Sequence, residues 1–141
     1  MSTEENKANS RRVFERLNQG DLTVIDELYA PNHVSHNPPN TTHGSEEYKQ
    51  GFALLLTAFP DWHTTIEDQL AEGDNVATRF TWSGTHKGAF WGIPPTGKHV
   101  TMTGMLISHW VGGKSDELWV NSDSLGLLQQ LGAIPAPGQA S

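Results

Sequence analysis

The order of two hydrophobic periodicities along the chain most constrains its fold. Apolar residues in the first 60 positions fall at helical spacing, as Tyr48 and Phe52 illustrate. Farther along, polar and apolar residues alternate, so that Val76, Phe80 and Trp82 share one face of a strand. Helical patterns therefore precede strand patterns. This order predicts an α+β fold in which N-terminal helices cover one face of an antiparallel sheet.

Turn and capping residues divide the chain into elements. A capping-box sequence begins at Ser2, Gly20 and Pro31 end the first two helices, and the pair Gly112–Gly113 predicts a tight hairpin turn. We predict helices over residues 2–19, 21–30, 45–59 and 125–131, and strands over residues 33–36, 63–72, 76–85, 98–110 and 115–123. A Gly- and Pro-rich loop separates the third and fourth long strands.

These elements predict one domain over residues 1–135, followed by a flexible C-terminal tail over residues 136–141. A strongly curved sheet with helices on its concave face encloses a cone-shaped cavity. We expect any ligand or chemistry in that cavity.

Composition narrows the function classes. The 141 residues include 9 Lys and Arg against 16 Asp and Glu, a formal net charge of −7, so no nucleic-acid or anionic-membrane partner is expected. The absence of cysteine excludes zinc–thiolate sites and thiol catalysis. No apolar run approaches the roughly 18 residues of a membrane span. The polar, acidic N-terminus is unlike a signal peptide, and we expect a cytoplasmic protein.

Several segments, in this order and spacing, resemble one known family. They are Asn18–Leu22, Ile25–Pro31, Phe59–Asp61, Gly84–Gly88, Gly92–Gly97 and Leu125–Gly132. Over about residues 5–135 the chain resembles the SnoaL-like polyketide cyclases, also called ester cyclases, of the nuclear-transport-factor-2-like superfamily.

The resemblance implies a cone-shaped α+β barrel, a homodimer and a pocket for a flat, hydrophobic small molecule. It also implies an intramolecular aldol cyclisation of a carbonyl-bearing substrate, with an aspartate as acid and base and with no cofactor or metal. A dehydratase or isomerase on the same scaffold, and a non-catalytic binding domain for a lipophilic ligand, stay open as alternatives. An ionisable group inside the cavity distinguishes an enzyme from the binding domain, and the binding domain is expected if Asp123 and His36 both face away from the cavity. A dimerisation module, whose own side chains would fill the cavity, is a third alternative.

Asp123 is the first candidate for the acid and base. It follows the last strand with the parity of Trp119 and Asn121, which places all three on one face. Since Trp119 is large and apolar, we expect that face to line the cavity. The competing interpretation is that Asp123 caps the terminal helix.

Two histidines are further catalytic candidates. The resemblance implies a histidine partner for the aspartate, and His109 precedes Asp123 by fourteen residues. However, a two-residue turn would pair Leu106 with Trp119 and place His109 on the opposite face, as a surface or interface residue. His36 stands beside the predicted turn at Asn37 and could be a pocket base, a hydrogen-bond donor or a structural residue.

A metal site is not predicted. His33 and His36 are three residues apart on one strand, so their side chains point to opposite faces and cannot share an ion.

Aromatic residues on the strands and in the loop are candidates for substrate binding. With two polar neighbours, the predicted set is Phe80, Trp82, His86, Trp91, Trp110, Trp119 and Asn121. Trp91 lies in the Gly- and Pro-rich loop, where it could cover the cavity mouth or contact a dimer partner. The predicted outer face of the long strands carries the apolar residues Met105, Ile107, Leu118 and Val120, which we expect to form the homodimer interface.

Overall fold

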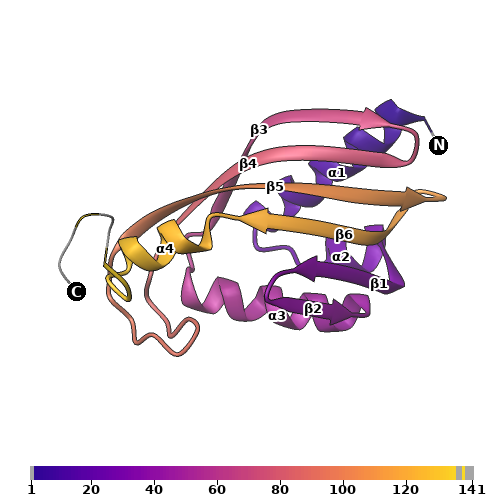
Figure 1. Ribbon diagram of the computed structural model, residues 1–141. Helices are drawn as coiled ribbons and strands as arrows, with labels where there is room; N and C mark the ends of the chain where they lie inside the picture. The colour runs from indigo at the N-terminus through magenta and orange to yellow at the C-terminus, as the bar shows by residue number, and fades with distance from the viewer. Residues whose placement is uncertain (1, 136–137, 139–141) are drawn as a thin grey trace.

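The computed structural model describes residues 2–135 and Gly138, in which four helices are arranged around one curved sheet (Figure 1). The helices are α1 (Thr3–Asn18), α2 (Thr23–Leu28), α3 (Ser45–Ala58) and α4 (Ser124–Gln130). The strands are β1 (Tyr29–Asn37), β2 (Asn40–His43), β3 (His63–Glu72), β4 (Asn75–Thr85), β5 (His99–Val111) and β6 (Lys114–Ser122). The predicted α+β class is confirmed. Apart from Gly138, the predicted flexible tail lies outside the described residues.

The six strands form one unclosed sheet in the order β2-β1-β6-β5-β4-β3. The prediction of a wholly antiparallel sheet is wrong, because β1 runs parallel to β6. The β3 to β6 strands are joined by consecutive antiparallel pairings. By contrast, α3 and four strands separate β1 from β6 in the chain, so no hairpin constrains their relative direction.

The first strand is longer than predicted, and β2 was missed. Tyr29 lies within the second predicted helix but begins β1 in the structure. The pairing of β1 with β6 is interrupted between Tyr29 and Val34, a stretch that contains Pro31, which has no N–H to donate. The predicted turn after Asn37 instead connects the hairpin of β1 and β2.

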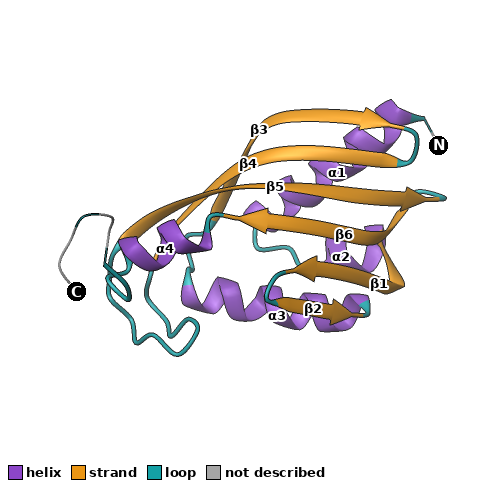
Figure 2. Ribbon diagram, in the orientation of Figure 1, coloured by secondary structure: helices purple, strands orange, loops and turns teal. Residues whose placement is uncertain are grey.

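Helices α1, α2 and α3 pack against one side of the curved sheet (Figure 2). α1 contacts β3 and β4, α2 contacts β1 and β6, and α3 contacts β1 and β2, while α4 contacts β5 near the start of that strand. The alternation in β4 is confirmed, since Val76, Thr78, Phe80 and Trp82 are all buried on the helix side. The hydrophobic core therefore lies between the inner face of the sheet and the helices.

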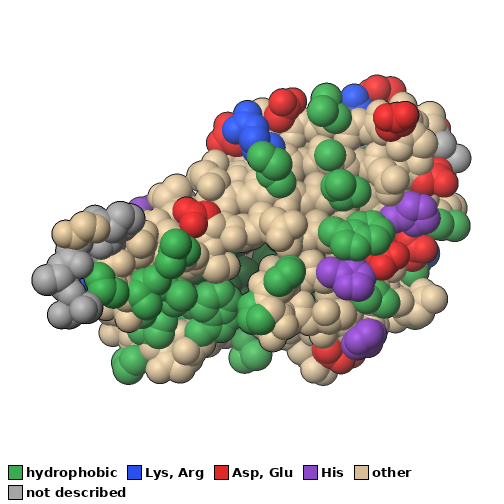
Figure 3. Space-filling model, viewed as in Figure 1, with side chains coloured by type: hydrophobic (Ala, Val, Ile, Leu, Met, Phe, Trp, Pro, Cys, Tyr) green, Lys and Arg blue, Asp and Glu red, His purple; other side chains and the backbone are tan. Residues whose placement is uncertain are grey.

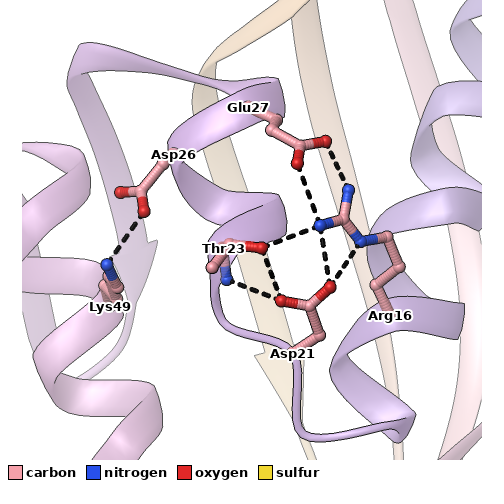
Figure 4. A network of polar contacts seen from close by, with 6 residues as sticks. All are labelled: Arg16, Asp21, Thr23, Asp26, Glu27 and Lys49. Carbon is pink, nitrogen blue, oxygen red and sulfur yellow. Dashed lines mark hydrogen bonds and ion pairs between the residues drawn. The ribbon is translucent and has the colours of Figure 1, made fainter.

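Polar contacts fix the first two helices relative to each other (Figure 4). The Arg16 guanidinium on α1 donates to the carboxylates of Asp21 and Glu27 and to the Thr23 hydroxyl. Hydrogen bonds from Thr23 and Arg16 lower the pKa of Asp21, and the Arg16 contact lowers that of Glu27. A second ion pair, from Lys49 on α3 to Asp26 on α2 at 2.9 Å, joins the third helix to this group. These contacts therefore join α1 to α2 and α2 to α3.

A β-bulge in β6 inverts the predicted faces of that strand. The turn is as expected, with Val111 paired to Lys114, but Trp119 pairs with Ile107 rather than Leu106. The register shifts between His109 and Trp110, where β6 contains one extra residue, Asp116. Because side chains alternate along a strand, one extra residue moves every later side chain to the other face.

Candidate functional site

A cavity of about 310 Å³ lies between the inner face of the sheet and helices α1 and α3. Its walls contain ten aromatic side chains: Phe14, Tyr29, Tyr48, Phe52, Trp62, Phe80, Trp82, Phe90, Trp91 and Trp110. Of the described residues that line it, none is Asp, Glu, His, Lys or Arg. In Figure 3 a hollow opens between α4 and the turn joining β1 to β2, and both segments contribute lining residues. The lining described is thus mainly aromatic and apolar and carries no charged side chain.

Four of the predicted aromatic residues line this cavity: Phe80, Trp82, Trp91 and Trp110. Sequence reasoning missed Trp62 and the contribution of α3. The helical stripe that includes Tyr48 and Phe52 was visible in the sequence, but helical spacing alone does not distinguish a side chain packed in the core from one at a cavity wall.

Trp119 and Asn121 lie on the outer face of the sheet, so the prediction that they line the cavity is wrong. The bulge at Asp116 is the cause, because it turns Leu118 and Val120 inward in their place. The same inversion removes Leu118 and Val120 from the predicted outer face.

His36 also lies on the outer face. Its ring stacks on Trp119 with centroids 5.7 Å apart, and its Nε2 lies 2.7 Å from a carboxylate oxygen of Glu117. His36 is not among the residues that line the cavity, so this position gives no support to its role as a pocket base.

His109 shares the outer face with Trp119, contrary to the predicted register. Its Nδ1 lies 2.6 Å from a carboxylate oxygen of Asp116, and this hydrogen bond raises the pKa of His109. The predicted surface position holds, whereas a catalytic role gains no support from the geometry.

Asp123 caps α4 instead of entering the cavity. Its side-chain oxygen accepts a hydrogen bond from the Gly126 backbone N–H at 2.9 Å, and the residue is exposed. The neighbours Ser122 and Ser124 line the cavity, while Asp123 does not. The placement therefore matches the capping interpretation, and the catalytic assignment stays a prediction without geometric support.

Substitution of Asp123 separates these two roles. Asp123→Ala removes the cap and is expected to lower the free energy of unfolding by about 1 kcal/mol, whereas Asn is also a good N-cap and should retain it. Urea denaturation of both variants measures the difference, and fluorescence titration should show unchanged ligand affinity. An Asn variant of normal stability that loses at least about 100-fold in turnover would restore Asp123 as the acid and base.

His86 was predicted to bind substrate but is buried beneath the loop over residues 86–97. Its Nδ1 accepts a hydrogen bond from the Thr96 backbone N–H at 3.2 Å, and its ring stacks on Phe59 with centroids 5.5 Å apart. It is not among the residues that line the cavity. His86 thus stabilises the loop through its contacts with Thr96 and Phe59.

Trp91 lies at the tip of that loop, at the boundary between cavity and solvent. It lines the cavity, is 49% exposed and stacks on Phe90 with centroids 4.6 Å apart. Phe90 and Ile93 pair across a two-residue turn, and Trp91 has a φ of 49°, a left-handed conformation that costs a non-glycine residue about 1–2 kcal/mol. This placement fits the predicted cover over the cavity mouth.

A buried histidine lies behind the cavity wall. His33 stacks on Tyr29 with centroids 4.2 Å apart and meets Tyr48 edge-on, and neither of its ring nitrogens has a hydrogen-bond partner among the described residues. Burial lowers the pKa of His33 to about 4, against the weaker opposing effect of the Asp116 and Glu117 charges. Burial also raises the pKa of both tyrosines, so their hydroxyl groups stay protonated.

Acid is expected to destabilise the protein through His33. Between about pH 6.5 and 4 the unfolded chain binds a proton here that the folded chain does not. This contribution to stability is therefore full above pH 6.5 and falls by up to about 3 kcal/mol as the pH drops to 4. Urea unfolding at several pH values should show a shallower acid loss for His33→Phe than for the wild type.

An exposed histidine supplies the control for this measurement. His63→Gln should keep the wild-type pH dependence. His109, with its raised pKa, stabilises the fold below its unfolded pKa and loses that effect as pH rises, but it is present in all three proteins. Equal acid slopes for His33→Phe and the wild type would contradict the assignment.

Comparison with known proteins agrees with the fold described above. The family model of the SnoaL-like polyketide cyclases matches residues 8–131. AclR from Streptomyces galilaeus, a suggested hydroxylase, is 32% identical with a TM-score of 0.86, over 95% of this chain and 100% of that chain. IdmH from Streptomyces antibioticus, a suggested polyketide cyclase, is 34% identical with a TM-score of 0.79, over 90% of this chain and 98% of that chain. A suggested SnoaL-like cyclase from Jannaschia sp. CCS1 is 26% identical with a TM-score of 0.87, over 94% and 95% of the two chains.

No curated protein sequence matches the chain. The fold and the cavity define an α+β protein with a pocket between its sheet and helices, and the chain belongs to the SnoaL-like polyketide cyclase family. The resemblance seen in the sequence is thereby confirmed.

Two further observations bear on partners. Within residues 2–135 and Gly138, no group of three or more His, Cys, Asp or Glu side chains is placed to hold a metal ion. In the same part of the chain, no helix has both the length and the apolar character needed to cross a membrane. The cytoplasmic location stays a prediction.

Proposed function

We propose that this protein binds a flat, uncharged, carbonyl-bearing molecule of the polyketide type in its cavity and closes a ring in it. The main support for this proposal is the cavity wall, which is rich in aromatic side chains and has no charged group among the described lining residues. A charged ligand would lose its hydration there without gaining an ionic partner, whereas flat aromatic faces gain contact area. Family membership supports the cyclase chemistry.

Confinement is the main means of catalysis in this proposal. In an intramolecular aldol reaction, a carbon next to one carbonyl loses a proton and bonds to a second carbonyl carbon, whose oxygen takes up a proton. A snug cavity holds the two carbons close together, which removes much of the entropic cost of ring closure. Tyr29 and Tyr48 line the cavity, and burial raises the pKa of both, so in this proposal a protonated tyrosine hydroxyl donates a hydrogen bond that polarises a carbonyl group and acidifies the neighbouring C–H bond.

Binding without catalysis is the second candidate, and a specific observation favours it. The three predicted acid and base residues, Asp123, His36 and His109, all lie outside the set of lining residues. The names given to AclR and IdmH, a hydroxylase and a cyclase, also differ within one fold. The nature of the ligand is therefore better supported than the reaction.

The two candidates are separated by binding and turnover measured on the same protein. Tricyclic aromatic keto esters that can undergo intramolecular aldol closure serve as probes. Saturable quenching of tryptophan fluorescence together with ring closure faster than in buffer would support the cyclase. Quenching with no added ring closure would identify a binding protein, and no quenching by any probe would contradict both.

The expected homodimer is also a proposal. The outer face of the sheet carries exposed apolar side chains, with Leu70, Met105, Ile107 and Trp119 lining one shallow groove. Figure 3 views the sheet from this side and shows hydrophobic side chains spread among acidic and histidine residues. A second copy that covers this face would remove that apolar surface from water.

Charge placed in the groove should separate the dimer. Ile107→Glu would desolvate a carboxylate at the interface, so we expect a tenfold or larger rise in the dimer dissociation constant by sedimentation velocity. Leu54→Glu, on the exposed side of α3, is the matched control and should leave the constant unchanged. A wild-type protein that sediments as a monomer at all concentrations would contradict the proposal.

A further inference from the structure

Among the described residues, three that line the cavity, Thr42, Trp62 and Thr64, have a buried side-chain polar atom with no hydrogen-bond partner, and the last two lie close together at the start of β3. Trp62 and Thr64 are 7% and 3% exposed, and both line the cavity. The Trp62 Nε1 and the Thr64 Oγ1 are buried and have no hydrogen-bond partner among the described residues. Buried polar atoms are normally paired, so an unpaired pair at a cavity wall calls for an explanation.

Trp110 also lines the cavity but differs from Trp62 in its hydrogen bonding. The Trp110 Nε1 donates to the Ser108 hydroxyl at 2.8 Å, so its hydrogen-bonding capacity is already used within the protein. Of the four tryptophans that line the cavity, Trp110 has its indole N–H paired within the protein, whereas the indole N–H of Trp62 is buried and unpaired.

The local backbone holds the two side chains in place. Residues 62, 63 and 64 alternate buried, exposed and buried at the entry to β3, so Trp62 and Thr64 share the inner face. The Asn18 side chain, at the end of α1, bonds both backbone groups of Thr64, accepting from its N–H at 2.8 Å and donating to its C=O at 2.9 Å. The Trp62 ring packs edge-to-face on Phe52 with centroids 5.0 Å apart. The backbone of Thr64 and the ring of Trp62 are thus held in place before any ligand arrives.

We propose that Trp62 and Thr64 form a subsite that binds a carbonyl oxygen of the ligand. This inference rests on the proposed function, since it assigns the orientation of the molecule held in the cavity. The indole N–H can only donate, and the hydroxyl can donate as well, so their common partner is an acceptor oxygen. The oxygen-bearing edge of the ligand lies toward β3, and its hydrocarbon part lies against the other aromatic walls.

A pair of ligands that differ by one oxygen tests the subsite. The probes are 9-fluorenone and fluorene, which share a flat tricyclic frame, while only the first has a carbonyl group. Their affinities are measured by calorimetry for the wild type and for Trp62→Phe and Thr64→Val, each of which removes a polar group and largely keeps the shape. Trp110→Phe is the control, because its N–H is already paired inside the protein.

The expected result is selective. Trp62→Phe and Thr64→Val should each weaken 9-fluorenone binding about tenfold relative to fluorene. Trp110→Phe should leave the ratio of the two affinities unchanged. Both subsite variants should be at least as stable to urea as the wild type, because each removes an unpaired buried polar atom. A variant that keeps the stability of the wild type but loses its preference for 9-fluorenone over fluorene is not expected if the replaced residue contributes only packing.

Two other results would overturn the inference, and they differ from each other. If the wild type binds both probes but neither subsite variant changes the affinity ratio, the subsite is wrong and the proposed cavity function stands. If the wild type binds neither probe, the cavity does not take flat aromatic ketones, and the proposed function fails together with the subsite.

Discussion

Leu106→Trp is expected to weaken ligand binding at least about 100-fold while the protein still folds. Leu106 is on β5, a central strand, and its side chain lines the cavity. A tryptophan there would extend into space that the ligand needs, and 100-fold corresponds to about 2.8 kcal/mol of lost binding free energy. Fluorescence quenching by 9-fluorenone measures the affinity, and near-ultraviolet circular dichroism checks the fold.

The same strand supplies the matched control. Thr103 is exposed on the outer side of β5, so Thr103→Trp adds the same ring outside the cavity and should leave affinity unchanged. Normal binding by Leu106→Trp, or equal losses in both variants, would show that the ligand does not occupy this cavity.

Phe59→Ala is expected to lower the free energy of unfolding by about 3–5 kcal/mol, the usual cost of deleting a fully buried ring. Phe59 is completely buried and caps the C-terminal end of α3. Its ring packs against Trp82, His86 and Phe90 at centroid distances of 5.2–5.5 Å. It therefore joins α3, β4 and the loop that covers the cavity, and urea denaturation followed by tryptophan fluorescence measures the loss.

Leu54→Ala tests whether that loss comes from the core. Leu54 is on the same helix but is 72% exposed, so its truncation should change stability by less than about 0.5 kcal/mol. A similar loss in both variants would mean that α3 contributes stability through helix formation and not through the packing of Phe59.

Local pattern was enough to predict much of the fold. The alternation of β4 has one consistent buried face, and the Gly112–Gly113 turn has the predicted pairing of Val111 with Lys114. These features depend on residues close together in the chain, whose spacing and turn preferences act locally. The same holds for the aromatic residues of β4, Phe80 and Trp82, whose inward position follows from their parity.

The contributions of α3 and β3 to the cavity wall could be recognised only in the tertiary structure. The stripe on α3 was visible, but which part of it borders empty space depends on how far the helix lies from the sheet. Trp62 carried no periodic signal of its own, and the unpaired state of its N–H can be recognised only when every neighbouring acceptor has been placed.

The sequence by itself determined the parity relation among Trp119, Asn121 and Asp123, the order of helices and strands, and the family. Only the tertiary structure decided which face of β6 points inward. The extra residue Asp116 has no local signature, because a bulge exists only in the pairing of β6 with β5. With the bulge, Leu118 and Val120 are buried in the core and Trp119 stacks on His36 outside. That choice depends on the packing of the whole sheet, which no spacing within one strand encodes.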